Sequence, residues 1–206
     1  MFSLKQDIEL MRSMDSQYSY QWYIQQFEAA KDTAEKFILS VDEARFLQPP
    51  ADDRWCIAEI YSHLINYGNL YFNNFATAIT NTQETTNDLE QSFQPRWLVR
   101  KLVNFFEPPY KIKMKTIDSM QPDPVSDYNR MELLDEYVNL QDRFLAQIEK
   151  GQHRHVNLAA TKMKHPFISW INMTLTECLA LAEVHQRRHQ WQAEQALEAL
   201  KEKSQI

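Results

Sequence analysis

The stretch from Thr174 to Leu200 constrains the fold most strongly, because apolar residues recur along it at helical spacing. Such a pattern is typical of one long amphipathic helix with a stripe that faces a core. Thr174 and Glu177 have the Thr-x-x-Glu spacing of a capping box, which predicts that the helix begins there. The stripe consists of Leu175, Cys178, Leu179, Ala182, Ala193, Ala196, Leu197 and Leu200.

Two histidines, His185 and His189, fall inside this stripe. Because they are four residues apart, their imidazoles lie one turn apart on the same face of the helix. A buried imidazole without a partner would be costly, so each ring needs either a hydrogen bond to a neighbouring helix or a metal ion. The spacing alone favours ordinary core histidines, and a third ligand elsewhere in the chain would reverse that preference.

Three further stretches show the same helical spacing, and glycine is rare, with only Gly68 and Gly151 in 206 residues. Scarce glycine disfavours barrels, sandwiches and glycine-rich phosphate loops. We predict an all-α four-helix bundle that forms a single domain over residues 1–206, with residues 1–16 as a lead-in. A long crossover joins the second and third helices. The predicted helices run from Gln17 to Phe46, Trp55 to Ile79, Ser126 or Asp127 to Gly151, and Thr174 to Leu200.

Local signals suggest how these helices begin, end and pack. Asp52 and Asp53 follow two prolines and are expected to cap the second helix. Gly68 lies inside the second helix, where we expect a neighbouring helix to approach closely. Gly151 is placed to end the third helix as a residue in the C′ position.

The crossover, residues 80–126, contains a shorter helical pattern from Arg96 to Phe106. Residues 111–117 then alternate between polar and apolar, which predicts an extended run. The lysines of that run form either a rim that binds anions or, as the pattern favours, an ordinary solvated face. Residues 156–173 are expected to form a loop, in which His165 precedes a proline.

Charge and cysteine usage narrow the functional classes. The formal net charge is −6, so a dominant role in nucleic-acid binding is not expected. Cys56 and Cys178 form neither a CxxC motif nor a disulfide framework, and we interpret both as small buried residues rather than catalytic thiols. The N-terminal residues lack an apolar signal core and no stretch approaches the length of a membrane span. We therefore expect a cytoplasmic protein without a membrane partner.

Three stretches together resemble the DinB-like family of metal-binding four-helix bundles. The first, at 55–64, reads WCIAEIYSHL and is similar to the start of that family's second helix. The second, PPYKIKMK at 108–115, is similar to its crossover. The third is the His-Pro pair at 165–166, followed by a His-x-x-x-His-x-x-Gln pattern at 185–192. The resemblance covers nearly the whole chain from residue 17 onward.

The resemblance implies a metal site made by one histidine of the second helix and two of the fourth. By motif these are His63, His185 and His189, so the resemblance reverses the preference for core histidines. Three imidazoles with open positions are typical of a catalytic metal site, and they suit nickel and zinc equally. Such a site needs further groups that hold the other nitrogen of each ring. Our candidates are Glu59, Asn66, Tyr67 and Gln192, although each also suits an ordinary hydrogen bond between helices.

Characterised relatives implied by the resemblance include metal-dependent S-transferases and an isomerase that use bacillithiol or mycothiol. A divalent-metal enzyme of this kind, either a transferase using a low-molecular-weight thiol or a hydrolase, is one hypothesis. The alternative is a non-enzymatic stress or interaction protein with a structural or vestigial metal site. Bulky Tyr67, Trp170 and Trp191 would support the alternative if they filled the pocket.

Two features bear on the substrate pocket and on assembly. Many relatives carry glycine soon after the His-Pro pair, whereas this chain has residues Phe167 to Trp170, which predicts a differently shaped loop. Members of the family often pair, and Trp22, Tyr23 and Trp97 are aromatic residues that we expect on the surface. A homodimer that binds a small-molecule substrate or thiol is therefore expected.

Overall fold

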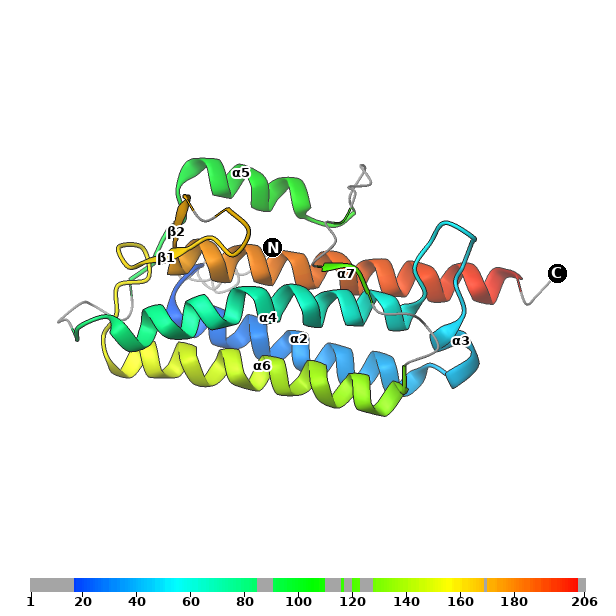
Figure 1. The fold of residues 1–206 in the computed structure, drawn as a ribbon. Coiled ribbons are helices and arrows are strands. Elements are labelled where there is room, and N and C mark those ends of the chain that lie inside the picture. The colour runs from blue at the N-terminus through cyan, green and yellow to red at the C-terminus, as the bar shows by residue number, and fades with distance from the viewer. Residues whose placement is uncertain are drawn as a thin grey trace, which may run out of the picture.

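Four long helices run side by side in the computed structural model, which describes residues 17–84, 91–109, 116, 120–122, 128–168 and 170–203. They are α2 (Tyr20–Ser40), α4 (Ile57–Asn81), α6 (Arg130–His153) and α7 (Leu175–Lys203) (Figure 1). Helix α2 packs mainly against α6, and α4 packs against both α6 and α7. The predicted all-α four-helix bundle is thus confirmed.

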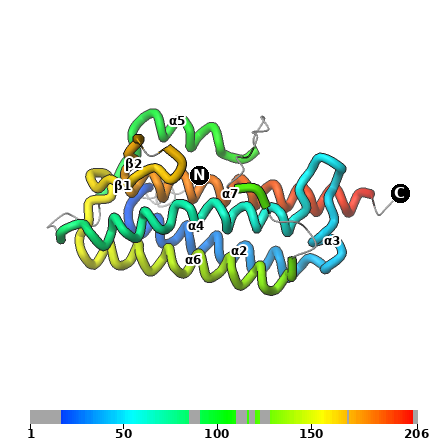
Figure 2. Tube along the Cα trace, viewed as in Figure 1, coloured from blue at the N-terminus to red at the C-terminus, as the bar shows by residue number. Residues whose placement is uncertain are grey.

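Smaller elements cover the end and one side of this bundle. Helix α3 (Glu43–Leu47) follows α2, and α5 (Trp97–Phe106) lies outside the bundle against α7. Strands β1 (Lys162–Lys164) and β2 (Asn172–Thr174) form an antiparallel hairpin just before α7. Figure 2 shows the same order along the chain, with the hairpin and α5 on the same side. The prediction that residues 156–173 are only a loop was therefore wrong.

The first predicted helix is divided in two, which corrects the expected range from Gln17 to Phe46. Ser19 caps α2 by accepting a hydrogen bond from the Trp22 N–H, and α2 ends where Val41 takes an extended conformation. Asp42 then starts α3, because its carboxylate accepts from the Arg45 N–H at 2.9 Å. An aspartate that can satisfy free N–H groups makes this break favourable, although the apolar spacing continues through it.

Helices α4 and α7 begin with capping boxes. Cys56 and Glu59 form the box of α4: the Glu59 carboxylate accepts from the Cys56 N–H at 2.8 Å, and the Cys56 sulfur accepts from the Glu59 N–H. The prediction that Asp52 or Asp53 caps this helix was wrong. Thr174 and Glu177 form the predicted box of α7. The Thr174 nitrogen lies 2.9 Å from the Glu177 carboxylate oxygen, and the Glu177 nitrogen lies 3.3 Å from the Thr174 hydroxyl oxygen.

Both glycines occupy close contacts between helices. A Cβ on Gly68 would lie 2.5 Å from a methyl carbon of Leu140 in α6, which confirms the predicted close packing. The prediction that Gly151 ends α6 was wrong, because the helix continues to His153. A Cβ there would lie 2.8 Å from Ile79 and 2.9 Å from the Tyr20 hydroxyl, so this glycine lets α2 and α4 approach α6.

Some predictions fall outside the described residues. These are the lead-in at 1–16, the caps Ser126 and Asp127, and all of the run at 111–117 except Thr116. Within the described part, Asn129 caps α6 by accepting from two backbone N–H groups. No helix of that part is long and apolar enough to cross a membrane.

Aromatic side chains fill the centre of the bundle. Phe144 of α6 is fully buried and contacts three other phenylalanine rings, with centroid distances of 5.2 Å to Phe27, 5.2 Å to Phe72 and 5.9 Å to Phe75. Because these rings come from α2, α4 and α6, one side chain joins three of the four long helices. Its contacts hold α4 in the position from which it meets α7.

We expect Phe144→Ala to lower the free energy of unfolding by about 3–5 kcal/mol, because the substitution leaves a cavity among packed rings. Guanidinium unfolding followed by circular dichroism measures this loss. The matched control is Phe105→Ala on α5, whose ring is exposed, and we expect a change within about 0.5 kcal/mol. Equal losses in the two variants would contradict the proposed role of Phe144.

Candidate metal centre

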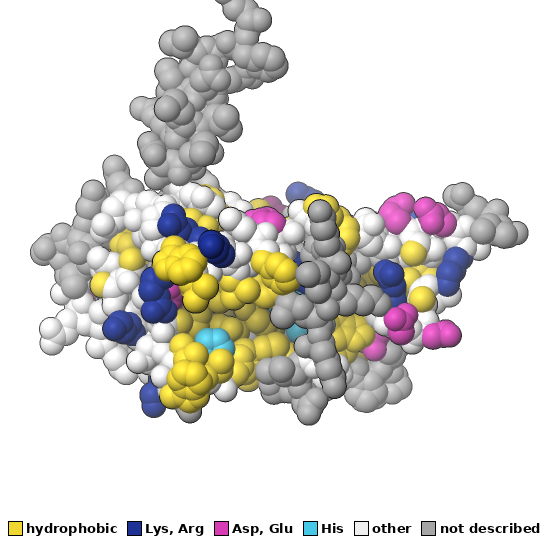
Figure 3. All heavy atoms as spheres, turned by 90° about the horizontal axis from the view of Figure 1, so that it is seen from above, with side chains coloured by type: hydrophobic (Ala, Val, Ile, Leu, Met, Phe, Trp, Pro, Cys, Tyr) yellow, Lys and Arg dark blue, Asp and Glu magenta, His cyan; other side chains and the backbone are white. Residues whose placement is uncertain are grey.

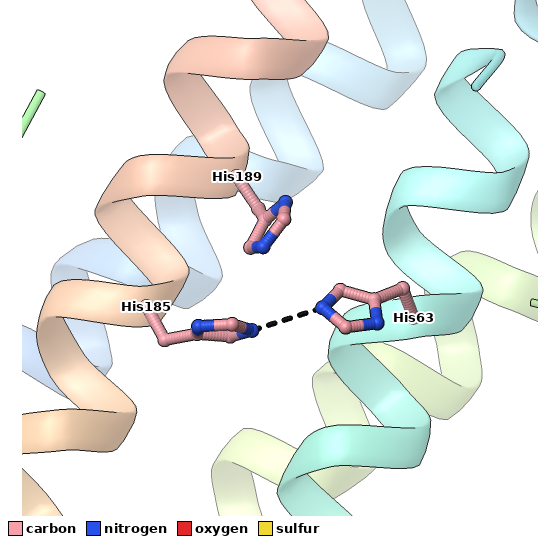
Figure 4. A group of neighbouring side chains, drawn as sticks. All are labelled: His63, His185 and His189. Atoms are coloured by element: carbon pink, nitrogen blue, oxygen red, sulfur yellow. Dashed lines mark hydrogen bonds between the residues drawn. The ribbon is translucent and has the colours of Figure 1, made fainter. Parts of the chain in front are cut away.

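Three histidines converge where α4 packs against α7. His63 comes from α4, and His185 and His189 lie one turn apart on α7 (Figure 4). The Nε2 atoms of His63 and His185 are 3.0 Å apart, and one ring nitrogen from each histidine lies within 4.8 Å of the other two. The structure therefore brings together the three residues that the motifs single out.

The crossover determines which nitrogen of His63 carries its proton. Nδ1 of His63 lies 2.7 Å from the backbone carbonyl oxygen of Met120. Because a carbonyl oxygen only accepts, the neutral ring carries its proton on Nδ1 and turns the Nε2 lone pair toward the other two histidines. Asn66, one turn after His63, donates to the carbonyl oxygen of Gln121 at 3.0 Å and so anchors the same segment of the crossover.

Burial keeps the three rings uncharged. Desolvation is the main cause that lowers the pKa of each ring, and it takes the pKa values of His185 and His189 well below the usual value. The neighbouring histidines and the positive charge of Arg188 lower the pKa values of His185 and His189 further. The side chain of Gln192 opposes this shift, because it raises the pKa of His189. Neutral imidazole is the form that binds metals.

Aromatic rings enclose the cluster. Trp55 packs against His63 and His189, with centroid distances of 5.0 and 6.4 Å. Tyr67 stacks on His185 at 3.9 Å and 15°, and Phe106 of α5 meets the edge of the same ring at 6.4 Å. His63 and His189 are buried, whereas His185 is partly exposed. His185 is therefore the one histidine of the three that solvent reaches in part.

The donor set fits a divalent metal ion. Nitrogens bound to one zinc at about 2.0–2.1 Å lie about 3.3 Å apart in a tetrahedral site, which is close to the 3.0 Å between His63 and His185. Nδ1 of His189 is buried and forms no hydrogen bond to any group in the described part of the chain. Nε2 of His63 and Nε2 of His185 can share a proton in a hydrogen bond at their distance, and neutral imidazoles that converge in this way can instead share a metal ion.

The four candidate supporting residues have different surroundings. Asn66 and Tyr67 contact the site as described, through the crossover and through the ring of His185. Gln192 raises the pKa of His189 through its side chain. Glu59 instead completes the capping box of α4. Sequence reasoning missed the Met120 carbonyl, because a backbone acceptor leaves no signal in residue identity, and it missed the packing role of Trp55, although the motif at 55–64 contains it.

Helix α5 is held over the site by ion pairs at both of its ends. Before its first turn, Arg96 donates from Nε and Nη2 to the buried carboxylate of Glu177, at 2.5 and 2.8 Å. After its last turn, Glu107 pairs with Arg187, which also pairs with Glu183 of α7. These pairs place Phe106 against His185.

The pKa values of the two buried carboxyl groups, Glu177 and Glu183, are shifted in opposite directions. Burial acts to raise the pKa of Glu177, but the hydrogen bonds from Arg96 and the Thr174 N–H outweigh it and lower the pKa. Burial prevails at Glu183, whose pKa is raised although Arg187 opposes the shift. Glu177 is therefore a fully charged partner that holds the start of α5 on α7.

The three aromatic residues that we expected on the surface differ in exposure. Tyr23 is fully buried and donates to the Thr176 carbonyl at 2.9 Å, and Trp22 is partly buried, so the prediction was wrong for Tyr23. Trp97 is exposed. Trp170, a residue considered as filling the metal pocket, is 82% exposed and does not fill it.

The chain itself supplies no reactive thiol. Cys56 and Cys178 are both buried, in agreement with their interpretation as small core residues. Burial raises the pKa of Cys56 to about 12 and that of Cys178 far above its usual value. Because the thiolate is the nucleophile, both side chains are inert near neutral pH.

The family of the chain is consistent with this geometry. Residues 26–193 match the DinB superfamily. No curated protein and no solved structure matches the chain. The matched range begins within α2 and ends within α7, and it contains all three histidines.

Both cysteines should resist thiol reagents in the folded protein. At about pH 8 the raised pKa values leave the thiols protonated, so Ellman's reagent should release almost no colour until the chain is unfolded. In guanidinium chloride both thiols should react. A thiol that reacts rapidly in the native protein would show that one cysteine is accessible and ionised, and would reopen the interpretation of a catalytic thiol.

Proposed function

The chain belongs to the DinB superfamily, and on this premise we propose that it is a divalent-metal-dependent enzyme whose metal is held by His63, His185 and His189. The observation that carries the proposal is the convergence of three neutral imidazoles with one partly exposed member. Three nitrogen ligands and an accessible side are typical of catalytic sites, whereas structural zinc sites are closed by a fourth protein ligand. Nickel and zinc both suit this donor set.

The reaction we favour is transfer of a low-molecular-weight thiol to an electrophile. A divalent metal ion held here would act as a Lewis acid that favours the deprotonated form of a thiol or water. The thiol has to be a second substrate, because Cys56 and Cys178 are buried and protonated. Hydrolysis by water is the related alternative, and it would need no thiol.

The surrounding residues would orient the ligands and exclude bulk water. The Met120 carbonyl keeps the proton of His63 on Nδ1 and leaves Nε2 free for coordination. Tyr67 fixes the plane of His185 by stacking, and Trp55 packs on the other two rings. Substrate would approach beside His185, between Tyr67 and Phe106.

A non-enzymatic protein with a structural metal is the second candidate, and one observation favours it. Trp55 and Tyr67 pack directly on the ligand rings and leave only His185 partly exposed. In that case metal binding would stabilise the bundle without turnover. The predicted homodimer and cytoplasmic location belong to neither candidate in particular, and they stay predictions.

Metal analysis tests the site itself. Purified protein reconstituted with nickel or zinc near neutral pH should hold about one ion per chain by plasma mass spectrometry, because three imidazoles bind one ion. His185→Ala should lose this ion. His153→Ala is the matched control, because His153 is exposed at the end of α6, and it should keep the ion. Equal metal content in the two variants would reject the three-histidine site.

A turnover assay separates the enzymatic candidates. With bromobimane as electrophile, reconstituted protein should consume thiols such as cysteine or glutathione faster than metal-free protein does, and His185→Ala should fall to the metal-free rate. Ester hydrolysis without added thiol would instead support the hydrolase. If the metal raises the melting temperature but no thiol or ester reacts, the structural candidate is supported.

A further inference from the structure

Helix α5 turns its larger apolar side chains away from the bundle. Val103 is its buried residue, with Val99 and Phe106 partly buried. On the outer side Leu98, Leu102 and Phe105 follow one another at intervals of four and three residues, so they form one stripe. Their exposed fractions are 64%, 40% and 44%, and that of the adjacent Trp97 is 62%. The solvent side of a surface helix is normally polar, so this face requires an explanation.

This orientation is a fixed property of the fold. The ion pair of Arg96 with the buried Glu177 holds the beginning of α5, and the ion pair of Glu107 with Arg187 holds its end. Turning the stripe toward α7 would break both pairs and would leave Glu177 charged and buried without Arg96. The apolar face therefore remains at the surface of the folded protein.

Positive charge surrounds this stripe. Arg100 and Lys101 are exposed on α5, which contains no acidic residue, and the Lys101 ammonium lies 4.7 Å from the centre of the Trp97 ring. The hairpin is joined to the start of α5, because Arg96 donates to the Asn172 carbonyl at 3.3 Å. Figure 3 looks down on α5 and shows hydrophobic side chains bordered by Lys and Arg. This basic, apolar face belongs to a chain whose net charge is −6.

The hairpin adds exposed basic and aromatic side chains to those of α5. Lys162 and Lys164 are exposed on β1, and Trp170, in the connection between the strands, is 82% exposed. Trp, Leu and Phe beside Lys and Arg are the side chains that place an amphipathic helix at the boundary between lipid headgroups and acyl chains. The long stems of lysine and arginine let their charges reach the headgroups while the apolar stripe is buried.

We propose that the outer face of α5, defined by Trp97, Leu98, Lys101, Leu102 and Phe105 and supported by Trp170, binds the surface of an anionic lipid bilayer. Charge complementarity favours this occupant: positive side chains flank an apolar stripe, and a bilayer with anionic headgroups offers the opposite charge above an apolar interior. A second copy paired through the same face would bring Arg100 and Lys101 of two chains together, which like-charge repulsion disfavours.

Such binding differs from spanning a membrane. The absence of a spanning segment led us to expect no membrane partner, and no helix in the described part of the chain could cross one. The ten residues of α5 are far too few to span, but they are enough to lie in the plane of the interface. With one short helix the binding should be weak and reversible.

Sedimentation with lipid vesicles tests the proposal on the full-length protein. The protein should sediment with vesicles that contain phosphatidylglycerol and stay in solution with phosphatidylcholine alone, and added salt should weaken the binding. Arg100→Gln with Lys101→Gln should weaken partitioning by roughly 30-fold, because two favourable charges are lost. Leu98→Glu with Leu102→Glu should abolish it.

Matched controls separate this face from general apolar exposure. Leu39 and Met131 are 57% and 46% exposed on α2 and α6, away from α5, so Leu39→Glu with Met131→Glu should bind vesicles like the unchanged protein. Circular dichroism and thermal unfolding confirm that each variant folds. Failure to bind anionic vesicles, or equal binding by all variants, would overturn the proposal. Light scattering that shows a dimer lost in Leu98→Glu with Leu102→Glu would also overturn it, because a second copy would then cover the face.

Discussion

The packing of α4 against α7 is the constraint on which the rest of the structure depends. It buries His63 and His189 and partly buries His185, so that polar rings lie where water is scarce. Removing water from a charged imidazole is costly, which is why the pKa values of these rings are lowered and the rings stay neutral. Neutral imidazoles whose ring nitrogens lie close together are suited to a metal ion, so the burial that costs the fold free energy also favours metal binding.

Segments outside the bundle supply further contacts to the histidines. The crossover contributes the Met120 carbonyl that selects the tautomer of His63. Helix α5 contributes Phe106, and the ion pairs to Glu177 and Arg187 hold α5 in place. Buried charges are tolerated there because each has an opposite charge and hydrogen bonds. The same pairs also keep the apolar side of α5 at the surface, so the enclosure of the site and the exposed face have one structural cause.

Interactions between residues close in the chain could be predicted from the sequence, whereas most contacts between distant residues could not. The capping box of Thr174 and Glu177 was predicted because both partners are three residues apart. The break at Val41 and the cap formed by Cys56 were missed, because apolar spacing says little about which polar group satisfies a helix end. The role of Gly151 was misjudged for another reason. Its neighbours, Ile79 and Tyr20, are distant in the chain, and only the folded bundle brings them within contact.

By itself the sequence determined the helical class and the order of the four long helices, since helical periodicity is a local property of the chain. The resemblance of its motifs to a family singled out His63, His185 and His189 as candidate ligands. The tertiary structure alone decided that His63 meets His185 at 3.0 Å, that the Met120 carbonyl holds His63, and that α5 turns its larger apolar residues outward. These features depend on contacts between residues far apart in the sequence. Such contacts are set by how helices pack and how buried charges are paired, and residue order does not encode them in any local pattern.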